Sequence, residues 1–296
     1  MSDAGRGGSS SAGLGDWIKR LIGASDRPPS VKTRPDVLVA GAGPCGLTAG
    51  LALARHGLRV RIVDQERDPS LHGYAVVLHP ATIGLLRRLG VAERLLPLGH
   101  RIKRVALHAE GERKAELDLA ACGEGDPFAL VLPQRELEDE LRRQLESFGA
   151  RVDWHHRLSS FRTGTGGLEA TVEKLDRSSS GYPVARTSKM VVGEQTCWAR
   201  YLVGADGFHS LVRRRMEWSY DERGPAQAFS IYELDAPPED PDCMTVWWTD
   251  EGVCALIPRG PLRARWCFQI SSPDEHDPSL EALKSLVRSR APWMRV

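Results

Sequence analysis

A glycine-rich turn at residues 41–46 holds the first residues of this chain whose types and spacing suggest chemistry. It reads Gly-Ala-Gly-Pro-Cys-Gly. Gly41 permits a tight turn from a strand into a helix, Gly43 leaves room for a phosphate beside the backbone, and Gly46 allows the helix to pack closely on the strand. A β-branched residue at position 43 would block the phosphate and would resist the positive φ that we expect there. We therefore predict that Gly41, Ala42, Gly43 and Gly46 bind the pyrophosphate of a dinucleotide.

The elements on either side of the turn agree with this prediction. An apolar strand at residues 37–40 leads into the turn, and an apolar helix follows from about Leu47 to His56. The N-terminus of that helix offers unpaired N–H groups and a partial positive charge to phosphates. A second apolar strand ends at Asp64, 23 residues after Gly41, near the spacing at which a carboxylate reaches the ribose hydroxyls. The alternative is an ordinary strand–helix–strand unit whose glycines only make a turn, and the motif alone does not distinguish NAD from FAD.

A second strand-to-helix turn lies far along the chain, at residues 204–207, with the sequence Gly-Ala-Asp-Gly. Residues 201–203 form an expected strand before it, and Ser210 follows on an expected helix. This turn would place Asp206 and free backbone N–H groups at the C-terminal edge of a sheet, where doubly wound folds bind ligands. We expect Gly41 and Asp206 to lie near each other at that edge. Taken alone, the same residues would be a plain turn.

The composition argues against several classes of protein. The 40 basic and 39 acidic residues give a net charge of +1, so nothing indicates nucleic acid or an anionic membrane as a partner. No run approaches the ~18 apolar residues of a membrane span. The six cysteines form no CxxC pair and no Cys/His cluster with zinc spacing. We therefore expect no metal site, and reduced thiols in a cytoplasmic enzyme.

The length of 296 residues suffices for two domains. Residues 1–33 are expected to form a disordered tail, because the first half of this segment is rich in Gly and Ser and has no core pattern. Residues 34–215 are expected to form the dinucleotide-binding domain, with a hairpin near residues 102–120 that belongs to the second domain. Residues 216–296 are expected to form the sheet of a substrate domain and the start of a return to the dinucleotide-binding domain, whose C-terminal part would be missing.

Hydrophobic spacing predicts the remaining elements. Helices are expected at residues 81–89 and 134–148, where apolar side chains recur at helical intervals. Alternating and short apolar runs predict strands at residues 103–119 (a hairpin), 130–132, 152–161, 168–175, 229–234, 244–248, 253–258 and 266–270. Trp247 and Trp248 lie in one of these strands, and we interpret them as packing residues rather than substrate contacts.

These motifs together resemble those of the FAD-dependent aromatic-ring hydroxylases, the single-component flavin monooxygenases of the p-hydroxybenzoate hydroxylase type. The matching segments are GAGPCG at residues 41–46 with Asp64 at the next strand end, LPQRELEDEL at residues 132–141, and GADGFHSLVR at residues 204–213. Their order and spacing agree with the family over roughly residues 34–290. The resemblance implies an α/β fold, in which an FAD-binding Rossmann-like domain of the glutathione-reductase type carries an inserted antiparallel β-sheet substrate domain.

The resemblance also implies a cofactor and an activity. FAD would be reduced by NADH or NADPH as a transient electron donor, and with O2 it would hydroxylate an aromatic or polycyclic small molecule. By position, Asp64 would hold the ribose of FAD, Gln134 would contact its flavin side, and Asp206 would serve both FAD and NAD(P)H. No acid, base or nucleophile stands out as a catalytic residue, as expected where the cofactor carries the chemistry.

One motif of that family is missing from this sequence. A Gly-Asp-Ala turn, which covers the ribityl chain in the family, occurs nowhere in the chain. We therefore expect a C-terminally truncated monooxygenase that retains FAD weakly. The apolar side chains of residues 279–296, including Leu280, Leu283, Leu286 and Val287, would then lack part of their packing partners.

Other activities remain as alternatives. A flavin-dependent halogenase would carry a GWxWxIP segment, but residues 252–258 lack both tryptophans. An NAD-linked dehydrogenase would require a catalytic His, Lys or Tyr arrangement, and none is evident. A non-catalytic flavoprotein remnant and an FAD-dependent oxidoreductase other than a hydroxylase also stay open. A yellow protein with bound flavin would argue against the dehydrogenase.

Overall fold

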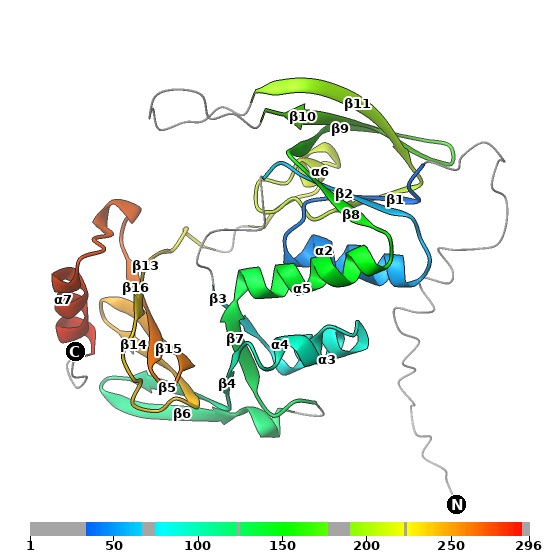
Figure 1. The fold of residues 1–296 in the computed structure, drawn as a ribbon. Coiled ribbons are helices and arrows are strands. Elements are labelled where there is room, and N and C mark those ends of the chain that lie inside the picture. Colours follow the sequence, from blue (N-terminus) through cyan, green and yellow to red (C-terminus); the bar gives the residue numbers. More distant parts are fainter. Residues whose placement is uncertain (1–33, 67–74, 123–124, 177–189, 222–223, 292–296) are drawn as a thin grey trace, which may run out of the picture. The chain divides into compact units, whose positions relative to one another are not determined.

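The computed structural model describes residues 34–66, 75–122, 125–176, 190–221 and 224–291, which belong to two compact units (Figure 1). The first unit comprises residues 1–68 and 142–216, and the second comprises residues 69–141 and 217–296. Helix α5 (Gln134–Ser147) is divided between them in sequence, after Leu141. The tail expected at residues 1–33 lies outside the described residues.

A four-stranded parallel sheet forms the centre of the first unit. Its neighbouring strands are all parallel and follow the order β12 (Tyr201–Gly204), β1 (Val37–Ala40), β2 (Val60–Asp64) and β8 (Arg151–Trp154). Strand β1 is buried along its whole length, as expected for a parallel strand covered on both faces. Because Ala40 pairs with Gly204, the chain leaves β1 and β12 at the same edge of the sheet.

Helix α2 (Pro44–Arg55) covers one face of this sheet, and a three-stranded antiparallel sheet covers the other (Figure 1). That second sheet has the order β11 (Val191–Ala199), β10 (Gly167–Leu175) and β9 (His156–Gly164). Buried side chains from both sheets form one core cluster, which includes Leu38, Ala40, Val63, Leu158, Ala170, Val172 and Cys197. The short helix α6 (Leu211–Arg215) follows β12 and adds Val212 to the same cluster.

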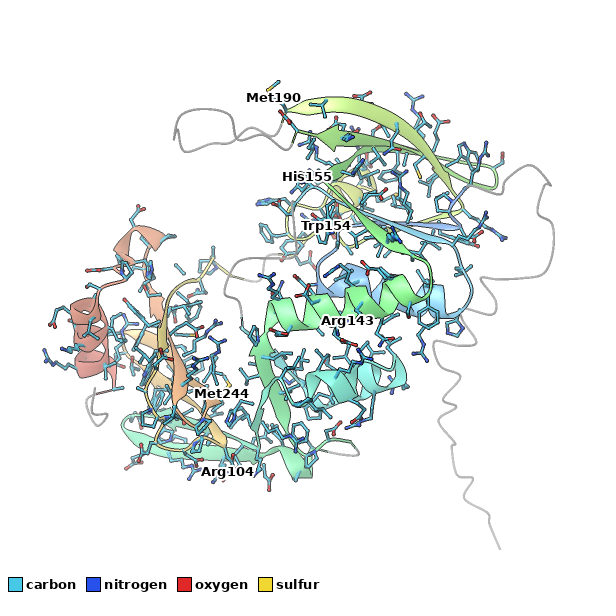
Figure 2. The ribbon with its side chains drawn as sticks, viewed as in Figure 1. Arg104, Arg143, Trp154, His155, Met190 and Met244 are labelled. Carbon is cyan, nitrogen blue, oxygen red and sulfur yellow. The ribbon has the colours of Figure 1, made fainter. Side chains whose placement is uncertain are left out.

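The single strand expected at residues 152–161 is wrong, because the chain changes sheets at His155 (Figure 2). His155 has a positive φ of 57°, which ends β8 and starts β9 in a new direction. Its N–H donates to the carbonyl of Glu66 at 3.0 Å, and its carbonyl accepts from the N–H of Leu175 at 2.8 Å. This residue therefore links the parallel sheet to the antiparallel one. Strand β11 was not expected from the sequence.

A six-stranded sheet dominates the second unit, in the order β13 (Ala228–Leu234), β16 (Arg263–Ile270), β15 (Gly252–Gly260), β14 (Cys243–Thr249), β5 (Arg104–Ala109) and β6 (Glu112–Asp118). The expected hairpin and the four expected strands near the C-terminus are confirmed. The sheet is not purely antiparallel, because β14 and β5 pair in parallel. This mixed pairing arises where the earlier hairpin joins strands that lie more than 100 residues later in sequence.

A smaller antiparallel sheet lies in the same unit, with the order β3 (Ala75–Leu78), β7 (Ala129–Pro133) and β4 (His100–Ile102). Helices α3 (Pro80–Arg88) and α4 (Ala92–Leu95) connect β3 to β4. Single 3-10 turns occur at Leu119–Ala121 and Pro273–Glu275. Met244 and Ile257 of the six-stranded sheet pack against the buried cluster of this smaller sheet.

Helix α7 (Leu280–Arg290) packs on the opposite face of the six-stranded sheet. Leu283 and Val287 are only 1% and 2% exposed, and they contact a cluster that contains Trp247, Trp266 and Phe268. The expectation that residues 279–296 lack part of their packing partners is therefore wrong for these two side chains, whereas Leu280 is exposed and residues 292–296 lie outside the described residues. Within the described part of the chain, no helix combines the length and the apolar character needed to cross a membrane.

Candidate cofactor site

The two strand-to-helix turns lie in contact at one edge of the parallel sheet. The N–H of Ala205 donates to the carbonyl of Ala40 at 2.8 Å, directly below the glycine-rich turn. Gly41 has a φ of +99°, and a Cβ at this position would overlap the carbonyl group of Ala205. The expected proximity of Gly41 and Asp206 is therefore confirmed, and both the conformation and the contact require glycine at position 41.

Gly46 is required by close packing inside the same turn. A Cβ at position 46 would overlap the carbonyl oxygen of Gly41, and it would come within 3.3 Å of the Cβ of Ala205. The helix thus approaches the turn as closely as the sequence predicted.

Gly43 differs from these two glycines, because no contact with the described part of the chain requires glycine there. Its φ of −70° and ψ of −178° are accessible to any residue, so the expected positive φ is wrong. A Cβ at position 43 would meet no described atom within 4 Å. The absence of a side chain at this position leaves an open space directly outside the turn.

The N-terminus of α2 faces this position and has no side-chain cap. Pro44, at the start of the helix, has no N–H group, and the N–H groups of Cys45 and Gly46 belong to the turn that cannot form intrahelical bonds. The first intrahelical bond runs from the N–H of Leu47 to the carbonyl of Gly43, at 3.0 Å. No acidic residue lies in the first turn to offset the partial positive charge. These features together suit a bound anion.

Asp64 holds its carboxylate against the glycine-rich turn. One carboxylate oxygen accepts from the N–H of Ala42 at 2.6 Å, and the other accepts from the N–H of Glu66 at 2.8 Å. An ionised carboxylate has about four acceptor positions, so it can accept further hydrogen bonds from a ligand. The bond from Ala42 was not expected from the sequence, although the strand-end position of Asp64 was.

Asp206 uses its carboxylate to cap helix α6. It accepts from the Ser210 hydroxyl at 2.5 Å and from the N–H groups of Leu211 and Val212 at 2.7 and 3.2 Å. The Ser210 hydroxyl in turn accepts from the N–H of Arg213 at 3.0 Å. Sequence reasoning missed this capping role, although an Asp and a Ser directly before a helix are a known start signal. The cofactor role of Asp206 stays a prediction.

Gln134 begins helix α5 and belongs to the second unit. Its side-chain amide donates to the Glu138 carboxylate at 2.7 Å, one turn further along the helix. Glu138 is 2% exposed, so this bond satisfies part of a buried acidic group. The predicted contact of Gln134 with a flavin stays a prediction. Across the described residues, no three His, Cys, Asp or Glu side chains are grouped to hold a metal ion.

Comparison with curated proteins gives relatives that are monooxygenases or hydroxylases by name. The chain is 30% identical to the 6-methylpretetramide 4-monooxygenase of Streptomyces rimosus over 184 residues, which cover 62% of this chain and 30% of that protein. It is 30% identical to the aklavinone 12-hydroxylase DnrF of Streptomyces peucetius over 235 residues, which cover 73% of this chain and 45% of that protein. The chain thus spans less than half the length of these relatives.

Solved structures with the same fold include the p-nitrophenol 4-monooxygenase PnpA of Pseudomonas putida DLL-E4, at a TM-score of 0.69 and 19% identity. That match covers 88% of this chain and 62% of PnpA. A ternary complex of aklavinone-11 hydroxylase with FAD and aklavinone matches at a TM-score of 0.67 and 25% identity, covering 90% of this chain and 52% of that one. The family described as "FAD binding domain" matches residues 34–288, most of the chain. The chain belongs to this FAD-binding domain family.

Proposed function

We propose that this chain binds FAD and is part of an FAD-dependent monooxygenase. One observation carries the proposal: the N-terminus of α2 has no side-chain cap and opens onto Gly43, where only a ligand would require glycine. Membership of the FAD-binding domain family supports FAD over NAD as the resident dinucleotide.

The residues of the first unit fit the adenosine and pyrophosphate half of FAD. The uncapped N–H groups of α2 would bind the pyrophosphate, and the space beside Gly43 would admit it. The remaining acceptor positions of Asp64 would take hydrogen bonds from the ribose hydroxyls. Asp206 would act as a positioning residue, because its capping bonds hold the second turn beside the first. Gln134 is proposed as a contact of the flavin side.

FAD would supply the electron transfer and oxygen chemistry, and the protein would supply binding and orientation. We propose NADH or NADPH as the electron donor, O2 as the oxidant and an aromatic or polycyclic small molecule as the substrate. The substrate class rests on the names of relatives, which refer to 6-methylpretetramide, aklavinone and pentachlorophenol.

The two compact units suggest how these tasks are divided. We propose that the first unit holds the adenosine half of FAD, and that the six-stranded sheet of the second unit forms the substrate domain. A cytoplasmic location is also proposed, because all six cysteines are free thiols, as is usual in reducing compartments.

Two measurements test the proposal. Titration of FAD with the whole chain should quench flavin fluorescence in a saturable way, and a colourless chain with no saturable quenching would refute FAD binding. With a phenolic or polycyclic substrate, NAD(P)H oxidation should be stimulated, and the new hydroxyl oxygen should come from labelled O2. Incorporation of oxygen from labelled water would refute the monooxygenase activity and would favour another FAD-dependent oxidoreductase.

A further inference from the structure

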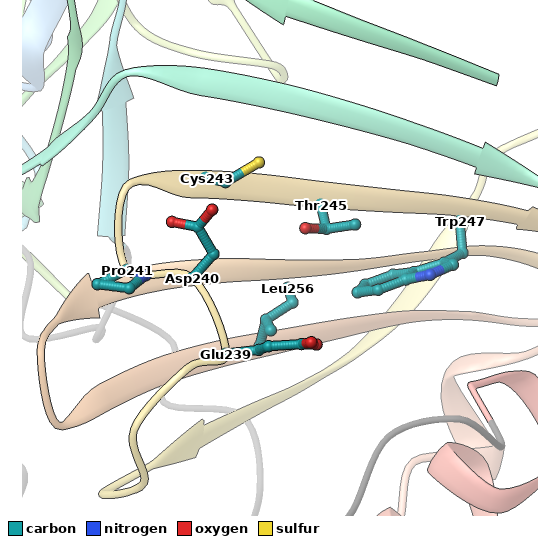
Figure 3. Close-up of a pocket in the computed structure, with 7 residues that line it drawn as sticks. All are labelled: Glu239, Asp240, Pro241, Cys243, Thr245, Trp247 and Leu256. Carbon is teal, nitrogen blue, oxygen red and sulfur yellow. The ribbon is translucent and has the colours of Figure 1, made fainter. Parts of the chain in front are cut away.

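A second candidate binding site lies in the second unit, beside the first half of strand β14 (Figure 3). It is a cavity of about 350 Å3, here called the β14 pocket, lined by Glu239, Asp240, Pro241, Cys243, Thr245, Trp247 and Leu256. Its volume equals the liquid volume of roughly a dozen water molecules, and it suits a ligand of about ten non-hydrogen atoms. The pocket lies on the six-stranded sheet proposed above as the substrate domain, and none of the residues proposed for FAD lines it.

The floor of the β14 pocket is formed by side chains of β14 and β15. Alternate residues of a strand point to the same side, so Cys243, Thr245 and Trp247 line one wall in sequence. The Trp247 ring stacks on Trp266, with ring centroids 5.3 Å apart. The ring is 4% exposed and also lies against the imidazole of His108, at a centroid distance of 5.8 Å. A ligand in the pocket would therefore contact the exposed edge of the packed Trp247 ring and the Thr245 hydroxyl.

The mouth of the pocket carries an uncompensated negative charge. The charge of Asp240 is neutralised by an ion pair, because one of its carboxylate oxygens accepts from the Arg104 guanidinium at 2.6 Å. Glu239 is exposed, and among the described residues no basic side chain forms an ion pair with it. The charge of Glu239 also acts on the neighbouring imidazole of His108. The pKa of His108 is lowered by burial and by Arg113, and Glu239 opposes this shift. The pocket thus combines one free carboxylate with an aromatic floor.

We propose that the β14 pocket binds a small organic cation, a protonated amine carried on a single ring. The ammonium would lie at Glu239, and the ring would contact Trp247 and Leu256. Aromatic side chains attract cations as well as apolar groups, so both parts of such a ligand find a partner. An anionic ligand would meet the unpaired carboxylate, and a metal ion would find too few ligands.

Three probes of nearly equal shape test this proposal: 2-phenylethylammonium, the neutral 2-phenylethanol and the anionic phenylacetate. Each is titrated into the whole chain, and binding is followed by ligand-observed NMR. The amine should bind about fivefold tighter than the alcohol, as expected for one partly exposed charge pair, and phenylacetate should bind weakest. Equal binding of the amine and the alcohol would overturn the proposal.

Variants locate the effect within the pocket. Glu239→Gln should reduce the amine-to-alcohol ratio to about one, while the affinity for the alcohol stays unchanged. Thr245→Met should fill the cavity and weaken both ligands. The matched control is Asp250→Asn, which removes an exposed carboxylate at the other end of β14 and should leave the ratio at about five. A control that lowers the ratio as much as Glu239→Gln would show that the charge acts at long range and would overturn the site.

Discussion

The two strand-to-helix turns of the first unit share a sheet edge and a topology but differ in how their helices begin. After β12, Asp206 and Ser210 cap helix α6 with four hydrogen bonds to and between themselves and the helix. After β1, helix α2 begins at Gly43 with no side-chain cap at all. Side chains of the chain itself cap α6, whereas the first N–H groups of α2 have no side-chain cap, and we propose that they bind a ligand.

This difference separates glycines that the fold requires from a glycine that we propose serves the ligand. Gly41 and Gly46 are fixed by contacts inside the protein, since a Cβ on either would overlap a backbone carbonyl. Gly43 faces open space with an ordinary φ. The motif of three glycines therefore contains two positions that the fold requires and one, Gly43, that we propose serves the ligand.

The largest expected effect comes from Gly43→Val, which places a branched side chain in the open space. FAD affinity should fall by more than about a hundredfold, which corresponds to about 2.7 kcal/mol. The free energy of unfolding without FAD should change by less than about 0.5 kcal/mol, because valine accepts this φ and ψ and meets no atom. Flavin fluorescence titration and denaturant unfolding measure the two quantities.

The matched control for this substitution is Gly193→Val on β11. Gly193 also lies in the first unit and also faces open space, but it is not part of either turn. Its FAD affinity should equal that of the wild-type chain. Normal FAD binding by Gly43→Val would contradict the proposed role of Gly43 in binding. A large loss of stability in this variant would show that the fold requires Gly43, as it requires Gly41 and Gly46.

Asp64→Ala should have the next largest effect, and again on binding. Hydrogen bonds to a charged acceptor contribute about 1.5–3 kcal/mol, so FAD affinity should fall by roughly 10- to 100-fold. Asp64→Asn should lose less, because the amide oxygen can still accept from the N–H of Ala42. Unchanged affinity in Asp64→Ala would remove this carboxylate from the site.

Gly46→Ala should lower the stability of the fold rather than act directly on FAD binding. The added Cβ overlaps the Gly41 carbonyl, and forced overlap in a packed region costs about 1–3 kcal/mol. Denaturant unfolding of the FAD-free chain should show this loss, whereas Gly43→Val should not. Equal stability of the wild-type and Gly46→Ala chains would contradict the close approach of helix and turn.

The sequence predicted the parts of the fold that depend on local patterns. Glycine positions and apolar periodicity are local features of the sequence. They predicted the strand, turn and helix at residues 37–56 and the four strands of residues 228–270. The turn at His155 could not be read in this way, because a histidine with positive φ has no distinct sequence signal. Strand β11 is mostly exposed and therefore lacks an apolar pattern.

Long-range strand pairing and helix capping also could not be predicted from the sequence. Parallel pairing of β5 with β14 joins residues 139 apart, as between Arg104 and Cys243, and no local signal encodes it. The sequence placed Asp206 correctly at the sheet edge but did not decide whether its carboxylate faces a ligand or its own helix. The orientation of this carboxylate depends on its distance from the N–H groups of Leu211 and Val212, which local sequence does not specify.

The smallest expected effects come from the capped turn, and they decide whether the contrast between the turns holds. Asp206→Ala and Ser210→Ala each remove a cap and should each lower the free energy of unfolding by about 0.5–2 kcal/mol. If Asp206 acts only by positioning, both variants should weaken FAD binding to a similar and small extent, and Asp206→Asn should recover most of the stability, since asparagine also caps helices. Unfolding curves with and without saturating FAD give both quantities from one preparation. The contrary result would be a more than tenfold loss of FAD affinity in Asp206→Ala, while Ser210→Ala loses as much stability but binds FAD like the wild-type chain. That result would make Asp206 a direct ligand contact, and the two turns would then both bind the ligand.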